Sequence, residues 1–403
     1  MSELRDELQT LLGNNYKNKD GSYSRLITHH KLDLGGETIP EEQDGKVKAK
    51  DLDELLLKMK NNGASDLHLV VGAPPKFRVN GELREIRGYA ILTPKETERL
   101  LSPLLDEETQ DIFERDGDLD FAYSKQGLGR FRVNLLKQRG TWAAVFRALA
   151  DSIPSADVLG LPTSITDLVS KKRGLILVTG PTGSGKSTTL ASLIDMINHK
   201  YRKNIITLED PIEYLHKHGT SNVIQREMGV DSKNFASALR AALREDPDVI
   251  LVGEMRDFET ISTAITAAET GHLVFSTLHT IGAGATIDRI LDTYPASQQS
   301  QARSQLATVI EGVISQQLIP KADLQGRIAA FEIMTGSTAI KSQIREGKTE
   351  HLSGTIQISK QDGMQLLDDH LRELLEKGLI NAESAIEFSV DKKTMLERLN
   401  LKQ

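Results

Sequence analysis

The clearest chemical motif in the sequence is a glycine-rich segment at residues 180–188, which reads Gly-Pro-Thr-Gly-Ser-Gly-Lys-Ser-Thr. It matches the pattern G-x-x-x-x-G-K-[ST], in which glycines allow backbone N–H groups to surround a phosphate. Lys186 is placed to reach the β- and γ-phosphates, and the hydroxyl of Ser187 is a ligand for Mg²⁺. We therefore predict a loop that binds ATP and Mg²⁺. Its residues are Gly180, Pro181, Thr182, Gly183, Ser184, Gly185, Lys186, Ser187 and Thr188.

Three acidic side chains follow a predicted strand at residues 204–208 and are candidates for a general base. They are Glu209, Asp210 and Glu213. In an open α/β sheet, ligands bind beyond the carboxyl ends of the parallel strands, which is where these carboxylates are expected. One of them would orient or deprotonate the attacking water. An acidic surface turn is the alternative interpretation of the same residues.

Two further apolar segments lead to polar side chains that suit phosphoryl transfer. Residues 248–252 lead to Glu254, which takes the position of a Walker B acid and holds Mg²⁺ through water. Gly253 departs from the common form of this motif, which has an aspartate there. The segment 271–280 contains His272 near its start and His279 near its end. We predict that His279 donates to a γ-phosphate oxygen, and a structural hydrogen bond is the alternative for both histidines.

Arginines gather in and after a predicted hairpin at residues 118–137. Arg130 and Arg132 share one face of its second strand, and Arg147 follows nearby. Arginines supplied to a nucleotide from a neighbouring domain or subunit recur in phosphoryl transfer, which makes these three residues candidates. A solvated strand face remains the alternative.

The elements that must position these residues divide the chain into four parts. Residues 1–48 are polar and glycine-rich, so we expect a weakly ordered extension. Residues 49–149 read as a small α+β domain, with Asn80 and Gly81 as a hairpin turn. A linker rich in Pro and Gly at residues 150–164 leads to the phosphate-binding domain at 165–403, which ends in a helical tail. Within that domain we predict an amphipathic helix over residues 304–314 and a strand over 327–334.

Composition excludes several classes of protein. The 403 residues carry a formal net charge of −7, so no global basic field indicates nucleic acid as a ligand. Cysteine is absent, which removes disulfides, thiol catalysis and cysteine-ligated zinc. No apolar run approaches the ~20 residues of a membrane span, and the first residues lack the apolar core of a signal peptide. We therefore expect a cytoplasmic protein.

The four phosphate-site segments together resemble the nucleotide-site motifs of the secretion ATPase superfamily. The Walker A, Asp box, Walker B and His box of that superfamily match residues 180–188, 209–213, 251–257 and 270–280. Residues 63–69 and 130–134 resemble its N-terminal domain, and the match covers roughly residues 50–385. The resemblance implies an α/β protein with a RecA-like P-loop ATPase domain, preceded by a small PAS-like α+β domain. It also implies a homohexameric ring.

The resemblance further implies functions for individual residues. Glu213 would be the catalytic base, Glu254 would serve Mg²⁺, and His279 would contact the γ-phosphate. Arg130, Arg132 and Arg147 match the region that supplies arginines to the site, without indicating which of them reaches the phosphate.

Within the superfamily, the chain most resembles the motors that retract type IV pili. Residues 339–346, Ala-Ile-Lys-Ser-Gln-Ile-Arg-Glu, are similar to the box Ala-Ile-Arg-Asn-Leu-Ile-Arg-Glu of that branch. We predict an amphipathic helix there, in which Ala339, Ile340 and Ile344 pack, and Lys341, Arg345 and Glu346 are free for a partner or a neighbouring domain. The absence of cysteine argues against the extension ATPases, which usually carry a four-cysteine zinc site.

This branch implies ATP hydrolysis that drives pilus retraction and twitching motility at the inner face of the cytoplasmic membrane. The implied partners are a pilus platform protein in that membrane and a second retraction ATPase. One alternative is an accessory retraction ATPase with little turnover. Another is a RecA-like nucleic-acid translocase, which the acidic balance and the lack of a basic stripe disfavour.

Overall fold

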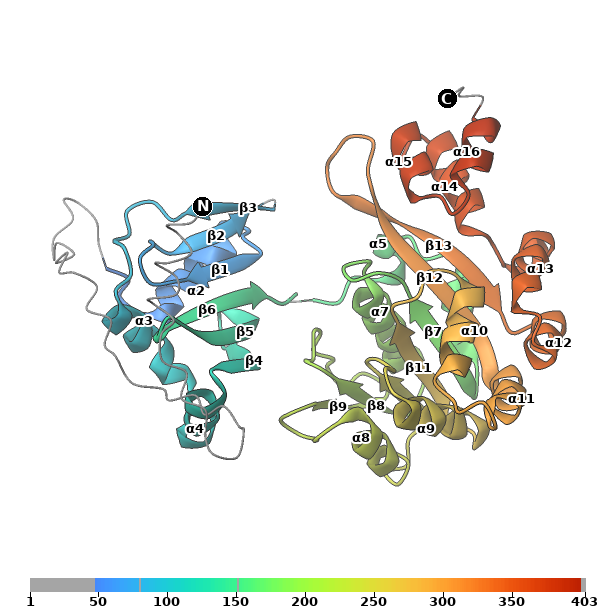
Figure 1. The fold of residues 1–403 in the computed structure, drawn as a ribbon, viewed down its shortest axis with the longest axis horizontal. Coiled ribbons are helices and arrows are strands. Elements are labelled where there is room, and N and C mark those ends of the chain that lie inside the picture. The colour runs from blue at the N-terminus through green and yellow to red at the C-terminus, as the bar shows by residue number, and fades with distance from the viewer. Residues whose placement is uncertain (1–47, 80, 151, 400–403) are drawn as a thin grey trace, which may run out of the picture. The chain divides into compact units, whose positions relative to one another are not determined.

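The computed structural model describes residues 48–79, 81–150 and 152–399 (Figure 1). The predicted N-terminal extension lies outside the described residues except for Lys48, and Asn80 of the predicted hairpin turn also lies outside them. Two β-sheets organise the described chain, one built from β1 to β6 and the other from β7 to β13.

The first sheet is antiparallel, with the strand order β3-β2-β1-β6-β5-β4. Phe131, Val133 and Leu135 of β5 lie on its buried face, where Leu55 and Met59 of α2 belong to the same core. The arginines that alternate with them in the sequence lie on the other face, as the period of two predicts. The elements are α2 (Leu52–Asn61), β1 (Asp66–Leu69), β2 (Lys76–Val79), β3 (Glu82–Glu85), α3 (Pro94–Leu101), β4 (Asp118–Lys125), β5 (Gly129–Gln138) and β6 (Thr141–Ala148).

One helix of this region, α4 (Glu107–Asp116), has no clear signature in the apolar pattern of the sequence, because it buries Phe113 alone. Capping residues set the two ends of α4. Asp106 and Thr109 form a reciprocal capping box at its start, and Gly117 ends it with a left-handed φ of 77°.

The second sheet holds the phosphate-binding loop and has the strand order β13-β12-β7-β11-β10-β8-β9. Neighbouring strands pair in parallel, except that β12 and β13 are antiparallel. The strands are β7 (Gly174–Thr179), β8 (Asn204–Glu209), β9 (Asn222–Glu227), β10 (Val249–Val252), β11 (Leu273–Leu278), β12 (Ile310–Pro320) and β13 (Arg327–Thr335).

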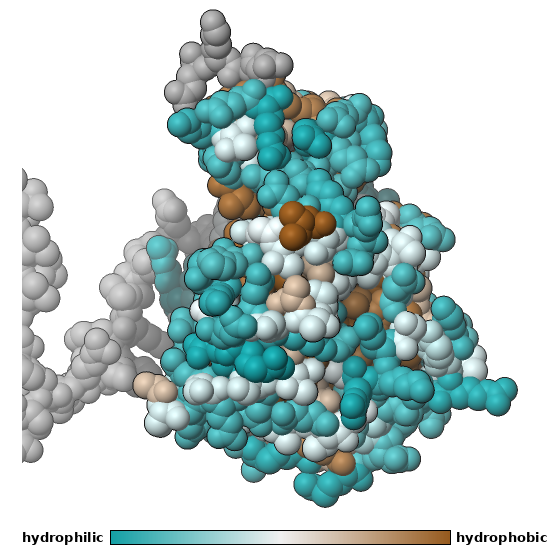
Figure 2. Space-filling view, turned by 90° about the vertical axis from the view of Figure 1, so that its right-hand side faces the viewer, coloured by the Kyte–Doolittle hydropathy of each residue, from teal (hydrophilic) through white to brown (hydrophobic). Residues whose placement is uncertain are grey.

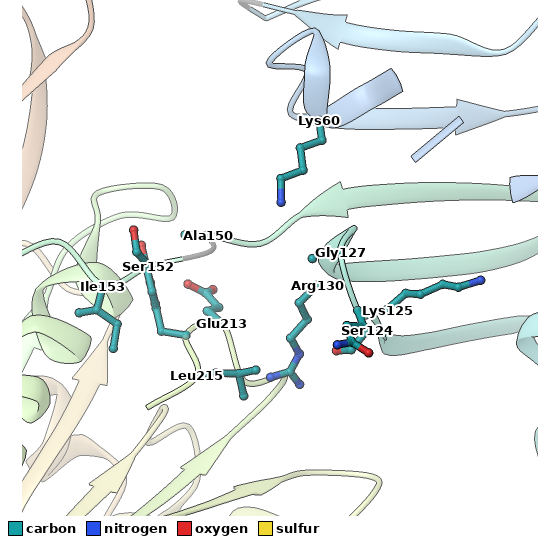
Figure 3. Close-up of a pocket in the computed structure, with 13 residues that line it drawn as sticks. Lys60, Ser124, Lys125, Gly127, Arg130, Ala150, Ser152, Ile153, Glu213 and Leu215 are labelled. Carbon is teal, nitrogen blue, oxygen red and sulfur yellow. The ribbon is translucent and has the colours of Figure 1, made fainter. Parts of the chain in front are cut away.

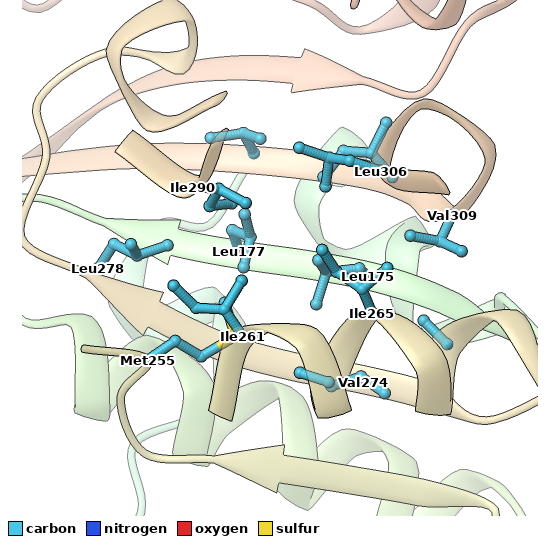
Figure 4. Close-up of a cluster of buried hydrophobic side chains, with 14 of the residues drawn as sticks. Leu175, Leu177, Met255, Ile261, Ile265, Val274, Leu278, Ile290, Leu306 and Val309 are labelled. Carbon is cyan, nitrogen blue, oxygen red and sulfur yellow. The ribbon is translucent and has the colours of Figure 1, made fainter. Parts of the chain in front are cut away.

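Helices cover both faces of this sheet, which explains why β7, β10 and β11 are buried at every position. Leu175 and Leu177 of β7 pack with residues of α9, α10 and α11 on one face (Figure 4). Ile176 and Val178 point to the other face, where they share a core with Leu193 of α7. Two short helices, α5 (Ala156–Leu159) and α6 (Thr163–Thr166), lie in the predicted linker and at its end. The helices of the domain up to β12 are α7 (Lys186–Lys200), α8 (Phe235–Ala242), α9 (Phe258–Glu269), α10 (Ala283–Asp292) and α11 (Gln299–Val309).

The predicted helical tail is present after β13. Part of it packs on the sheet edge, because Leu371 and Leu374 of α14 share a small core with Ile319 and Ala330. The helices are α12 (Thr338–Glu346), α13 (Leu352–Ile358), α14 (Leu367–Glu376), α15 (Ala382–Phe388) and α16 (Lys392–Arg398). In the described part of the chain, no helix has both the length and the hydropathy to cross a bilayer.

The prediction of one amphipathic helix over residues 304–314 is wrong in its second half. Helix α11 ends at Val309, and Ile310, Val313 and Ile314 belong to strand β12. Because β12 lies between β7 and β13 with both faces buried, its apolar residues do not alternate and imitate a buried helix. The strand predicted over residues 327–334 is confirmed as β13.

Candidate nucleotide-binding and active site

The four predicted phosphate-site segments meet at one edge of the second sheet. They follow strands β7, β8, β10 and β11, whose carboxyl ends lie together because these strands are parallel. A cavity of about 400 Å³ opens there. Its lining includes Thr182, Gly183, Lys186, Ser187, Asp210, Glu213, Glu254, Arg256 and His279. This edge is where an open α/β sheet binds its ligand.

The glycines of the loop are required by close backbone contacts as well as by phosphate access. A Cβ on Gly180, whose φ is 140°, would lie 2.2 Å from the carbonyl oxygen of Gln316. Gly185 has a φ of 87° and lies at the start of α7, so it turns the loop into the helix whose N-terminus faces the cavity.

Lys186 is almost completely buried beneath the loop, at 9% exposure. Its Nζ donates to the carbonyl oxygens of Gly180 and Pro181 at 2.9 and 3.0 Å. Burial lowers the pKa of Lys186, and the carboxylates of Glu213 and Glu254 partly oppose that shift. Acids from two of the other motifs are thus close enough to act on the lysine charge.

Gln316 is a residue of the site that the sequence pattern does not reveal. It lies on β12, is 3% exposed, and forms hydrogen bonds with the loop and with the first turn of α7. Its Nε2 donates to the carbonyl of Ser184 at 2.7 Å, and its Oε1 accepts from the Thr189 hydroxyl at 2.7 Å. No local motif marks this glutamine, because its contact with the loop spans more than 120 residues of sequence.

The three acids of the Asp box have different environments. Glu209 ends β8, and burial raises its pKa, while hydrogen bonds from Thr207 and Gln225 at 2.6 and 3.1 Å act in the opposite direction. Asp210 and Glu213 have exposed side chains and line the cavity. The structure therefore keeps Glu213 available to a water molecule, as a general base requires.

The glycine that replaces the usual aspartate in the Walker B segment packs closely against β8. The N–H of Gly253 donates to the Leu208 carbonyl at 2.7 Å, and a Cβ on this glycine would lie 3.1 Å from the same oxygen. The following carboxylate is held from both sides, since Arg256 Nε lies 2.7 Å from one oxygen of Glu254 and His279 Nε2 lies 3.7 Å from the other. His279 and Glu254, which were predicted from separate motifs, thus lie close to each other.

His272 does not belong to this group. Its Nδ1 lies 2.9 Å from the Ala267 carbonyl, just before the amino end of β11, whereas His279 follows the carboxyl end of the same strand. The alternative interpretation, a structural hydrogen bond, therefore fits His272.

Each candidate arginine contacts a carboxylate of its own chain. Arg132 lines the cavity and pairs with Asp120, and Arg147 Nε lies 2.9 Å from Asp66. Arg130 Nη2 lies 2.6 Å from Glu227. A second cavity of about 430 Å³ lies beside Arg130 and the loop that carries Glu213 (Figure 3). Of the three arginines, only Arg132 is among the residues that line the nucleotide cavity.

The donor set fits Mg²⁺ bound together with a nucleotide. Ser187 and Glu254 offer a hydroxyl and a carboxylate, the hard oxygen ligands that Mg²⁺ prefers. Within residues 48–79, 81–150 and 152–399, no cluster of three or more acidic or histidine side chains forms a metal cage. One hydroxyl and one carboxylate, as Ser187 and Glu254 provide, suit an ion that keeps several waters and takes its remaining ligands from phosphates.

Comparison with known proteins agrees with the motif assignment. Residues 41–393 match the family described as type II/IV secretion system protein. The type IV pilus retractation ATPase PilT of Pseudomonas aeruginosa is 47% identical over 84% of this chain and 97% of its own length. The type IV pilus ATPase PilU of the same organism is 37% identical over 83% of this chain and 88% of its own. A crystal structure of the pilus retraction motor PilT with bound ADP superposes with a TM-score of 0.82 at 48% identity, covering 88% of this chain and all of that one.

Proposed function

The chain belongs to the family of type II/IV secretion system proteins, and we propose that it hydrolyses ATP to drive type IV pilus retraction. The observation that carries this function is the 47% identity to a retraction ATPase over almost the whole length of that protein. The cavity at which Walker A, Asp box, Walker B and His box converge supplies the ATPase chemistry. The helix over residues 339–346, whose sequence is similar to the box of the retraction branch, is formed as α12.

The residues of the cavity have separate functions in the proposed phosphoryl transfer. The loop 180–188 would bind the phosphates, with Lys186 moving from the two carbonyls it now contacts to the β- and γ-phosphates. Ser187 directly, and Glu254 through water, would hold Mg²⁺. Bound there, Mg²⁺ would neutralise charge that develops on the phosphate oxygens.

Glu213 and His279 act at the γ-phosphate in this proposal. Glu213 accepts a proton from the attacking water, for which its exposed position in the cavity is suitable. His279 donates to a γ-phosphate oxygen, and this function is supported by its Nε2 lying 3.7 Å from Glu254, the acid proposed to serve the metal.

The oligomer proposed from the family is a homohexameric ring. A ring of heterologous contacts brings the surface of one subunit to the site of the next. Arg130, Arg132 and Arg147 are proposed to support such a shared site. Of the three, Arg132 lines the nucleotide cavity of its own chain, so it is also the first candidate for phosphate contact within one subunit. The other proposed partners are the pilus platform protein at the inner face of the cytoplasmic membrane and a second retraction ATPase.

Helix α12 offers a polar surface for such a partner. Figure 2 shows this side of the molecule as mainly hydrophilic, with separate apolar spots. Arg345 is exposed, while Ile340 and Ile344 are buried as expected. Three expectations for this helix are wrong. Lys341 is not free, since its Nζ lies 2.7 Å from Glu311, and Ala339 is exposed because it lies off the buried stripe. Glu346 is exposed but not free, since it lies 2.8 Å from Lys348 Nζ and accepts from the Ser342 hydroxyl at 2.9 Å.

The two alternative functions are less well supported. An accessory PilU-like ATPase fits less well, because identity to PilU is 37% against 47% for PilT of the same organism. A nucleic-acid translocase would need a basic surface, and the chain carries a net charge of −7.

Three substitutions test the proposed chemistry. Glu213→Gln should retain nucleotide binding and lose turnover by about 10²–10⁴-fold, the range for a general base. Lys186→Ala should lose productive nucleotide binding, and Glu254→Gln should weaken the dependence of nucleotide binding on Mg²⁺. Phosphate release and binding of a fluorescent ATP analogue, with and without Mg²⁺, measure these effects. Near-normal turnover of Glu213→Gln would reject Glu213 as the base and favour Glu254.

A further inference from the structure

The loop that carries Glu213 is held by side chains of the neighbouring edge strand, β9. We infer that Gln225 of this strand is a positioning residue, which fixes the backbone around Glu213 so that its carboxylate meets the attacking water. The inference rests on the proposed function of Glu213 as the base. It assigns a function in catalysis to a neutral side chain that touches neither the nucleotide-binding loop nor the Walker B acid.

The side chain of Gln225 makes three hydrogen bonds, one to the acid that ends β8 and two to backbone groups just after Glu213. Its Nε2 donates to the Tyr214 carbonyl at 2.8 Å and to Glu209 Oε1 at 3.1 Å. Its Oε1 accepts from the N–H of His216 at 2.7 Å. One amide thus holds the backbone directly after Glu213 and the acid at the start of the loop.

The backbone before Glu213 is held from the same strand. The N–H of Ile212 donates to Glu227 Oε2 at 3.1 Å, and Glu227 is 6% exposed. Gln225 and Glu227 are two residues apart on β9, so both side chains point to the same side of the strand. They hold the loop on both sides of Glu213, whose own side chain is left exposed at the cavity.

A third contact sets the position of this loop relative to the phosphate-binding helix. The hydroxyls of Tyr214 and Thr188 lie 2.8 Å apart, which connects the residue after Glu213 to the first turn of α7. Gln225 therefore acts on a segment that is also tied to the phosphate site. A displacement of about 1 Å in such a group can cost about 10²-fold in rate.

The side chain at position 225 must be both donor and acceptor. A glutamate there would still accept from the N–H of His216, but it would lose both donor bonds. Its oxygen would then face the Tyr214 carbonyl and the carboxyl group of Glu209. Glutamine is the residue of this size and shape that satisfies all three groups without adding charge.

The experiment compares Gln225→Ala and Gln225→Glu with the control Ile224→Ala. Ile224 is the adjacent residue of β9, points to the other side of the strand and is 41% exposed. We expect both Gln225 variants to lose about 10- to 100-fold in kcat. We also expect unchanged affinity for a fluorescent ATP analogue, a retained hexamer, and a control that behaves like the wild-type protein. Normal kcat in both Gln225 variants would overturn the inference, and so would an equal loss in the control.

A double-mutant cycle with Glu213→Gln separates positioning from a general structural effect. If Gln225 acts through Glu213, then Gln225→Ala should cause no further loss once the base has been removed, as measured by single-turnover hydrolysis. The same fold-loss in the Glu213→Gln background would overturn the inference and leave the proposed function intact. Near-normal turnover of Glu213→Gln alone would instead reject the proposed base, and with it this function of Gln225.

Discussion

Gln316 provides a quantitative test of how the phosphate-binding loop is supported. We predict that Gln316→Ala weakens nucleotide binding although residue 316 lies outside every phosphate-site motif. The substitution removes the donor to the Ser184 carbonyl and the acceptor for the Thr189 hydroxyl. The hydroxyl of Thr189 can donate to a carbonyl of its own helix instead, so the loss of its hydrogen bond to Gln316 should change the nucleotide affinity little. Ser184 is 2% exposed, and its carbonyl loses the donor supplied by Gln316.

The size of the effect follows from that carbonyl. A buried polar group without a hydrogen bond costs about 1–3 kcal/mol. In the free protein the loop can relax toward water, but nucleotide binding must restore its shape, so the cost appears in the affinity. At about 1.4 kcal/mol for each factor of ten, the dissociation constant should rise by about 5- to 150-fold.

Titration with a fluorescent ATP analogue measures this change, and Gln317→Ala is the matched control. Gln317 is the same residue type on the same strand, and its side chain points to the other face. Gln316→Glu should bind at least as weakly as Gln316→Ala, because it keeps the acceptor for Thr189 and places a carboxylate against the Ser184 carbonyl. An unchanged dissociation constant in Gln316→Ala, or an equal rise in Gln317→Ala, would refute this explanation of loop support.

Three further predictions concern coupling, subunit sharing and pH. Charge reversal by Arg345→Glu should preserve hexamers and most ATPase activity while abolishing twitching and leaving surface pili abundant, and cells without pili would instead indicate an extension motor. Lys341→Glu should lower the melting temperature, because the new carboxylate repels Glu311, with which Lys341 pairs. If Arg132 serves the site of a neighbouring subunit, Arg132→Ala subunits should regain turnover when mixed with Lys186→Ala subunits. No rescue in confirmed mixed rings would argue that Arg132 acts within its own subunit or is structural. Burial raises the pKa of Glu332 above its ordinary value near 4.5, so its contribution to stability is complete below that value and is lost as the pH rises through the raised pKa. Glu332→Gln should therefore gain in melting temperature relative to the wild-type protein as the pH rises above about 4.5, and a difference independent of pH would contradict this explanation.

Local sequence was sufficient for the residues that form the phosphate site, because each motif combines a buried strand with the polar group at its carboxyl end. Lys186, Glu213, Glu254 and His279 were predicted in this way, and the parallel sheet brings them to one cavity. The helix over residues 339–346 was also predicted, because Ile340 and Ile344 have helical spacing and are both buried.

Sequence alone failed where burial on two faces removes periodicity. Ile310, Val313 and Ile314 were assigned to a helix, although they form part of β12 beside the phosphate-binding strand. The same error concealed Gln316, because a glutamine has no visible function until its strand is placed under the loop. Charge pattern also misled at Lys341, whose pairing with Glu311 depends on the packing of α12 against β12.

What the sequence determined by itself is the chemistry: a glycine-rich loop, a lysine, acids and a histidine, each at the end of a strand that its own residues specify. The tertiary structure decided which side chains hold those groups in place. Gln225, Glu227 and Gln316 contact the site through hydrogen bonds to backbone groups that are distant in sequence or belong to a loop. Such bonds depend on strand order and register, which local propensity does not encode, because a backbone carbonyl or N–H is the same for almost every residue.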